Sequence, residues 1–204
     1  MKKFLVVPLT LLFLTGFLTQ TAGAAVGFKG GLALSNFNYS GEAPPEPLTN
    51  LTAPMGGIFF SLGFGPVSIQ PEVLYVRMGT RMEESPDWVE DRLDYVQVPV
   101  LLKINFVPGP ISPMIFAGPY GSYRLAAHEV SYIDGVSGSL DIKDQFKSTD
   151  YGVVFGGGLD FHLGFIKISG EARYNLGLAN IEANPTPGTS IKNKSLMFLA
   201  GIAF

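Results

Sequence analysis

The chain has 204 residues, of which 14 are Lys or Arg and 17 are Asp or Glu, so only 15% of it is charged, where an ordinary soluble domain is about 25% charged. Apolar residues make up 47%, yet 25 glycines and 15 prolines would interrupt any long buried helix, which argues against a helical membrane protein. Two histidines and no cysteine exclude a zinc-cysteine site, a thiol nucleophile and a disulfide framework, and a net charge of −3 without a basic tract predicts no nucleic-acid partner.

The first 24 residues have the three parts of a secretory signal peptide. Two lysines follow the first methionine, residues 4–18 form an apolar run, and residues 22–24 (Ala-Gly-Ala) form a small-residue cleavage site. The apolar run contains Pro8 and falls short of the roughly 20 residues that a membrane-spanning helix needs. We therefore predict a signal peptide at residues 1–24, export through the inner membrane, and a mature domain at residues 25–204.

The mature chain alternates apolar and polar residues with a period of two, in stretches that glycine and proline interrupt. This alternation predicts β-strands, and the breaks between them are alternately short and long. Four prolines exclude a transmembrane helix at residues 106–123, although that stretch has no charge. The predicted strands form four hairpins, at residues 26–37, 55–62, 67–81, 93–106, 114–125, 151–162, 165–178 and 192–204, and residues 126–150 are predicted to form a long loop.

The two faces of the predicted strands differ in polarity. In the fourth strand Val98, Val100 and Leu102 share an apolar face, whereas Gln97 and Lys103 share the opposite one. The third, sixth and seventh strands repeat this division, while the facing of the fifth strand stays open. Each strand with two such faces separates an apolar environment from a polar one.

The apolar faces predict a barrel in a membrane. A soluble barrel such as a lipocalin would turn its apolar face inward and its charges outward, but the apolar faces here contain almost no charge. Phenylalanines gather near the short breaks and tyrosines near the other strand ends, as in two aromatic girdles. We therefore predict an all-β fold, an eight-stranded antiparallel up-and-down transmembrane β-barrel, monomeric, with both termini in the periplasm and four loops outside.

The polar faces of these strands carry charges that would then lie inside the barrel. They balance to a sum of +1, and an eight-stranded barrel has an interior just wide enough for side chains to fill. We expect an inward-facing ion network that closes the lumen, with Glu72, Lys103, Glu171 and Arg173 at comparable heights. The predicted lumen residues are Lys29, Glu72, Lys103, Asp160, Lys167, Glu171 and Arg173.

The outer loops contain the remaining candidates for chemistry. His128, with Glu129 and Ser131 nearby, is predicted to be a solvated loop histidine and not a catalytic one, and His162 an interfacial residue at the periplasmic rim. Acidic residues crowd the second and third long loops without the spacing of a calcium loop, so they are solvated tips or bridge divalent cations to lipopolysaccharide. Trp88 either anchors a partner or packs locally. No catalytic, cofactor-binding or metal-binding residue is predicted.

Several short motifs occur in a characteristic order along the mature chain. They include residues 27–32 (GFKGGL) with the SNF at 35–37, the QPEVLY at 70–75, the strand at 95–103 centred on Pro99, and the terminal Phe204. In this order they resemble the PorT-type outer-membrane β-barrel domain of Bacteroidota-like bacteria. The resemblance implies an eight-stranded outer-membrane barrel without catalytic residues. It also implies that the last strand, with Phe198, Ile202 and Phe204, signals to the barrel-insertion machinery.

These observations predict a non-enzymatic integral outer-membrane barrel with a side-chain-filled lumen, which acts through its outer loops as a structural or interaction protein. The expected partners are outer-membrane lipid and lipopolysaccharide, the insertion machinery, and a protein of unknown identity at the outer loops; no cofactor is expected. Two alternatives remain open: an accessory component of a secretion or envelope-assembly complex, and a soluble periplasmic carrier of an apolar ligand.

Overall fold

The computed structural model describes residues 23–41, 48–84, 86–106 and 109–204. The predicted signal peptide lies outside the described residues, except for Gly23 and Ala24, which begin the first strand. None of the described residues forms a helix long and apolar enough to cross a membrane.

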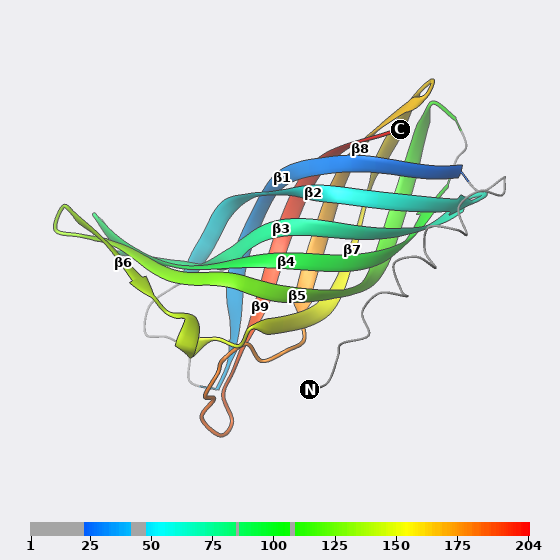
Figure 1. Cartoon of the computed structure of the whole chain (residues 1–204). Coiled ribbons are helices and arrows are strands. Elements are labelled where there is room, and N and C mark those ends of the chain that lie inside the picture. Colours follow the sequence, from blue (N-terminus) through cyan, green and yellow to red (C-terminus); the bar gives the residue numbers. More distant parts are fainter. Residues whose placement is uncertain (1–22, 42–47, 85, 107–108) are drawn as a thin grey trace, which may run out of the picture.

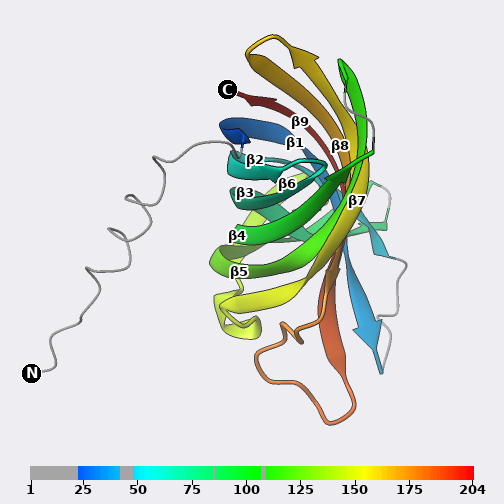
Figure 2. The ribbon, with the colours of Figure 1, turned by 90° about the vertical axis from the view of Figure 1, so that its right-hand side faces the viewer.

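Eight antiparallel strands form a closed ring (Figures 1 and 2). The ring order is β1-β2-β3-β4-β5-β7-β8-β9, and it closes where β1 pairs with β9. The predicted eight-stranded antiparallel barrel is confirmed. The strands are β1 (Gly23–Ser40), β2 (Leu48–Phe64), β3 (Val67–Glu84), β4 (Asp87–Asn105), β5 (Ile111–Ile133), β7 (Thr149–Leu163), β8 (Ile166–Gly177) and β9 (Ser190–Ala203).

Seven of the eight ring strands are longer than the sequence predicts, β8 being the exception, and one additional strand lies outside the ring. Residues 126–150 were expected to be a loop, but β5 runs on to Ile133 and turns into β6 (Val136–Asp141), which the short 3-10 helix η2 (Lys143–Gln145) follows. The turn consists of Asp134 and Gly135, both at positive φ (50° and 80°). Asp-Gly is the preferred pair for a two-residue hairpin turn, so the loop prediction for this segment was wrong.

The β3–β4 and β5–β6 hairpins project together at one end of the barrel. In Figure 1 they extend to the left, away from the C-terminus. We call this end, which has the long connections, the outer end, and the opposite one the turn end. The projecting part of the sheet, residues 79–83, 87–93 and 127–141, is called the outer extension below.

Alternate side chains of the ring strands point outward and are apolar. Val98, Val100 and Leu102 of β4 are 45%, 42% and 51% exposed, whereas Gln97 and Lys103 are buried. The fifth strand, whose facing the sequence left open, follows the same rule. Its outward residues include Ile111 and Ile115, and its inward ones are Ser112, Met114, Phe116, Tyr120 and Ser122.

The interior is divided along the barrel axis. Its outer half holds an apolar cluster that includes Phe37, Leu74, Met78 and Met197, while charged and amide side chains fill the half nearer the turn end. The seam between β1 and β9 is tight at Gly31, where a Cβ atom would collide with the carbonyl oxygen of Phe198. Glycine is therefore required there for the ring to close.

Candidate functional site in the barrel lumen

Five charged side chains from four strands meet inside the barrel. Lys29 of β1 donates to Glu72 of β3 at 2.7 Å and to Glu171 of β8 at 3.0 Å. Lys103 of β4 donates to the other oxygen of Glu171 at 3.1 Å. Arg173 of β8 bonds Glu72 at 2.8 and 3.2 Å and also pairs with Glu171. We call these five residues the lumen cluster.

The lumen cluster is shielded from water on all sides. Each of its members is at most 5% exposed, and Gln70 bridges it by donating to Glu72 at 2.6 Å and accepting from Lys103 at 3.2 Å. The rings of Phe59 and Phe116 lie under its cations, Lys29 at 4.5 Å from the first ring centroid and Arg173 at 5.3 Å from the second. Three cations and two anions leave a net charge of +1, which is shared over short, charge-assisted bonds.

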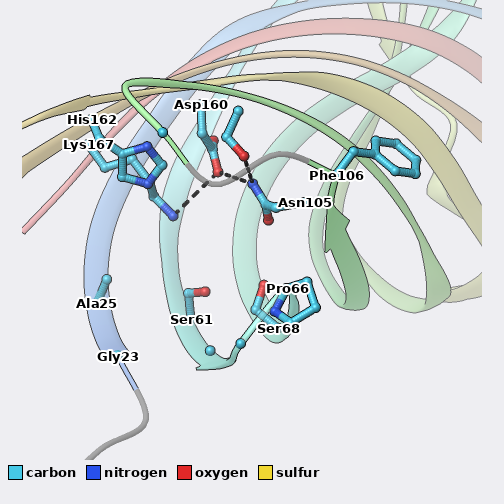
Figure 3. A pocket seen from close by; sticks show the side chains of 14 residues that line it. Gly23, Ala25, Ser61, Pro66, Ser68, Asn105, Phe106, Asp160, His162 and Lys167 are labelled. Atoms are coloured by element: carbon cyan, nitrogen blue, oxygen red, sulfur yellow. Dashed lines mark hydrogen bonds and ion pairs between the residues drawn. The ribbon is translucent and has the colours of Figure 1, made fainter.

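The other two predicted lumen residues lie apart from this cluster, at the turn end. Lys167 is 3.7 Å from Asp160, which also accepts a bond from Asn105 at 3.2 Å. Lys167 and Asp160 line a pocket of about 740 Å³ at the turn end of the barrel. His162 and residues in or next to the short turns, such as Ser61 and Ser68, line it as well (Figure 3). The seven residues expected in one network thus form a cluster of five and a pair at the rim.

Amide side chains and the carboxylate of Asp150 form a further polar layer, which lies outside the set of seven predicted lumen residues. Asn175 donates to Gln97 at 2.9 Å, and Asn193 donates to Asp150 at 3.0 Å. Alternation places Gln97 on the polar face with Lys103, and Asn175 has the same inward parity in its own strand. Asp150 lies one residue before the predicted sixth strand, which is why it was missed.

The chain after β6 folds back over the outer end of the lumen. Ile142 and Phe146 are 2% and 7% exposed, and the ring of Phe146 lies 5.9 Å from that of Phe37. Arg124 holds this turn in place by donating to the carbonyl oxygens of Lys143 and Phe146, both at 2.9 Å. Residues 142–147 are called the outer cap below; it joins the apolar cluster of the outer half.

Trp88 lies in β4 of the outer extension, where its ring stacks on Tyr132 with centroids 6.2 Å apart. The guanidinium of Arg81 covers the indole at 4.8 Å. The exposure of Trp88 is intermediate, and its contacts are with neighbouring strands. Of the two roles that the sequence left open for Trp88, partner anchor or local packing, these contacts correspond to local packing.

The expected loop histidine belongs to a strand. His128 lies in β5, and because neighbouring residues of a strand point to opposite faces, its side chain faces away from those of Glu129 and of Ser131. Asp91 of β4 pairs in register with Glu129, and burial together with that second carboxylate raises the pKa of Asp91 to about 6. In the part of the chain that the structure describes, no three acidic or histidine side chains form a metal-binding group.

The last strand presents its predicted insertion residues outward. Phe198 is 49% exposed, Ile202 36% and Phe204 56%, all on the apolar outer face. Phe204 also exchanges backbone hydrogen bonds with Val26 at 3.0 and 3.3 Å, so the chain end is held at the first strand.

Comparison with known proteins agrees with this architecture. The family model described as "Outer membrane protein beta-barrel domain" matches residues 19–182. The chain belongs to this family. It is an outer-membrane β-barrel protein, and the exposed apolar faces of its strands are the surface that a lipid bilayer covers.

Two solved structures of outer-membrane proteins are similar to this chain at low sequence identity, and the first of them shows the same fold. Neisserial surface protein A (NspA) is 13% identical with a TM-score of 0.54, and the match covers 90% of this chain and 98% of that one. The attachment invasion locus protein Ail of Yersinia pestis is 14% identical with a TM-score of 0.43, covering 89% of this chain and 99% of that one. No curated protein matches the chain.

Proposed function

We propose that this chain is a non-enzymatic outer-membrane barrel with a closed lumen, which acts through its outer extension as a structural or interaction protein. The observation that carries the proposal is the lumen cluster. Its five side chains come from β1, β3, β4 and β8 and bond one another across the barrel, so a solute would have to break buried ion pairs to pass. The outer cap adds a second, apolar closure.

Conductance tests the closed lumen directly. The refolded protein in a planar lipid bilayer is expected to give no steady conductance of about a nanosiemens, because an eight-stranded barrel has only enough interior for its own side chains. A steady open state of that size in single insertions would refute the proposal. A larger porin with a water-filled channel, recorded in the same membrane, controls for the sensitivity of the measurement, and the faster gel migration of the folded protein recovered from the bilayer lipid controls for insertion.

The arrangement of polar groups supports a non-enzymatic role. His128 faces away from the two neighbours that could activate it, and the buried carboxylates of the lumen cluster are engaged by cations. Nucleophilic or general-base catalysis needs a histidine or a carboxylate within hydrogen-bond distance of the nucleophile, at a place that a substrate can reach.

The outer partners are proposed on the same basis. The outward apolar side chains of the ring strands, called the apolar belt, contact lipid. The acidic outer extension binds a protein partner, or lipopolysaccharide through bridging divalent cations. Phe198, Ile202 and Phe204 are recognised by the insertion machinery. The motif order favours the PorT type within the family. A soluble carrier does not fit, because its exterior would need charge where Val100, Ile58 and Phe155 are exposed.

Crosslinking in cells tests the interaction role. A photoreactive residue in place of Trp88 is expected to capture a partner outside the cell, whereas one in place of Ile58, on the lipid-facing belt, captures only lipid or neighbouring barrels. Equal capture from both positions would contradict a role for the outer extension.

A further inference from the structure

Strand β6 (Val136–Asp141) has a neighbour on one side only. It pairs with β5 from Ile133↔Val136 to His128↔Asp141, and no other described residue pairs with its second edge. All six residues are exposed, with Val136 at 70% and Leu140 at 58%. β6 therefore presents a row of backbone groups to the solution beyond the outer end of the barrel (Figure 1).

The turn determines which backbone groups are free. In a two-residue hairpin the residues that flank the turn exchange hydrogen bonds, and every second pair after them does the same. The Ile142 N–H donates to the Ala127 carbonyl oxygen at 3.1 Å, as this alternation from the Ile133–Val136 pair predicts. The N–H and C=O groups of Ser137 and Ser139 consequently point away from β5.

Nothing in β6 protects this edge. Proteins usually block an exposed edge strand with proline, lysine, a bulge or a covering loop, because an unprotected edge pairs with other chains. The sequence of β6 is VSGSLD, without proline or lysine, and its only charge is Asp141 at the end. An edge of this kind accepts a further strand through main-chain hydrogen bonds.

Charge indicates which strand would be accepted. The outer extension contains seven acidic residues and two arginines, a net charge of −5. Both arginines are already bound to Glu90, Arg81 at 3.0 Å and Arg92 at 2.6 Å. A second copy of the same strand would bring two such negative surfaces together, whereas a basic segment would be attracted.

We propose that the free edge of β6 binds an extended segment of a partner protein, rich in lysine or arginine, as an added β-strand. Backbone hydrogen bonds to Ser137 and Ser139 hold the segment, Val136 and Leu140 contact its apolar side chains, and the acidic outer extension selects its positive ones. The inference rests on the proposed function and specifies the interaction surface and the chemistry of the partner.

The test uses the full mature protein in lipid nanodiscs and two fluorescent peptides of nine residues, one alternating lysine with valine and the other glutamate with valine. Fluorescence anisotropy should show that the lysine peptide binds at least about tenfold more tightly, with an affinity that falls as salt is added. Hydrogen exchange should show new protection at the amides of Ser137 and Ser139.

Two substitutions at one position isolate the edge. Ser139→Pro removes an outward N–H and leaves the bonds to β5 in place, so it should weaken peptide binding about tenfold. Ser139→Ala keeps the N–H and should bind like the wild type. Unchanged fluorescence of Trp88 shows that the outer extension of each variant is intact, and if the proline variant fails this check, hydrogen exchange on the wild type decides.

Three results would overturn the inference: no binding of the lysine peptide, equal binding of both peptides, or binding without new protection of β6. A crosslinked partner at Trp88 combined with any of these would leave the proposed function standing and remove only the β6 site. If neither a crosslinked partner at Trp88 nor peptide binding at β6 is found, both proposals are rejected.

Discussion

Removing the charge of Glu171 should destabilise the barrel more than removing the charge of Lys103, which has Glu171 as its only carboxylate partner among the described residues. Glu171 accepts bonds from Lys29 at 3.0 Å and Lys103 at 3.1 Å and also pairs with Arg173. In Glu171→Gln, three buried cations share the single carboxylate of Glu72, and the cluster charge rises from +1 to +2. In Lys103→Met the charge falls to zero, and Glu171 keeps two cationic partners.

The expected costs follow from this imbalance. Breaking a buried ion pair by neutralising one partner costs about 3 to 5 kcal/mol, because a desolvated charge remains. Glu171→Gln should lie in that range. Lys103→Met should cost less than about 2 kcal/mol, since methionine preserves the length of the side chain and its contact with Phe116 while every remaining charge keeps a partner.

Urea titration of the protein folded into lipid vesicles measures both values. The folded fraction is read from the faster gel migration of the unheated barrel and from far-ultraviolet circular dichroism, and the two readouts must coincide for the free energy of unfolding to be defined. If Lys103→Met costs as much as Glu171→Gln, the charge-balance argument is wrong.

Four further predictions follow from the structure. Gly31→Ala should impair barrel closure, seen as slow folding into vesicles, whereas Gly30→Ala, whose Cβ would lie 3.5 Å from the nearest atom, should fold normally. Phe146→Ala should cost about 3 to 5 kcal/mol locally and speed hydrogen exchange of the outer cap without changing that of the lumen strands. The outer extension should become less stable as pH rises from about 4 to about 6, because the pKa of Asp91 is higher in the folded protein than in the unfolded chain; Asp91→Asn should abolish this dependence in Trp88 fluorescence. Deleting Phe204 should slow assembly in cells and leave a protease-sensitive periplasmic form, and unchanged assembly would contradict its role as a signal.

The barrel could be predicted from the sequence because its signal is local. Alternation with a period of two assigns each residue to a face without any knowledge of the partner strand, as for Val98 and Lys103 of β4. The outer extension was missed because its acidic strands have the composition of a loop. The Asp134-Gly135 pair is the one local signal for the β5–β6 hairpin, and the acidic composition of the flanking residues masks it.

The lumen site could be predicted only in part. Parity indicates which charges point inward, but the height at which each one lies depends on strand tilt and stagger, which a single sequence does not determine. For that reason Asp160 and Lys167 were grouped with residues from which the structure separates them. The outer cap has no periodic pattern, so Phe146 gave no sign that it would be buried.

The lumen cluster also explains how the ring strands keep their register. A one-residue slip of a strand turns its inward side chains toward lipid, and a lysine or arginine at the bilayer midplane costs about 2 to 4 kcal/mol. The three cations lie on β1, β4 and β8, so a slip of any of these strands exposes its own cation and removes a partner from a buried carboxylate. The penalty therefore applies on both faces of the sheet at once. The outer extension lies beyond the lumen cluster, so this penalty does not constrain its sequence.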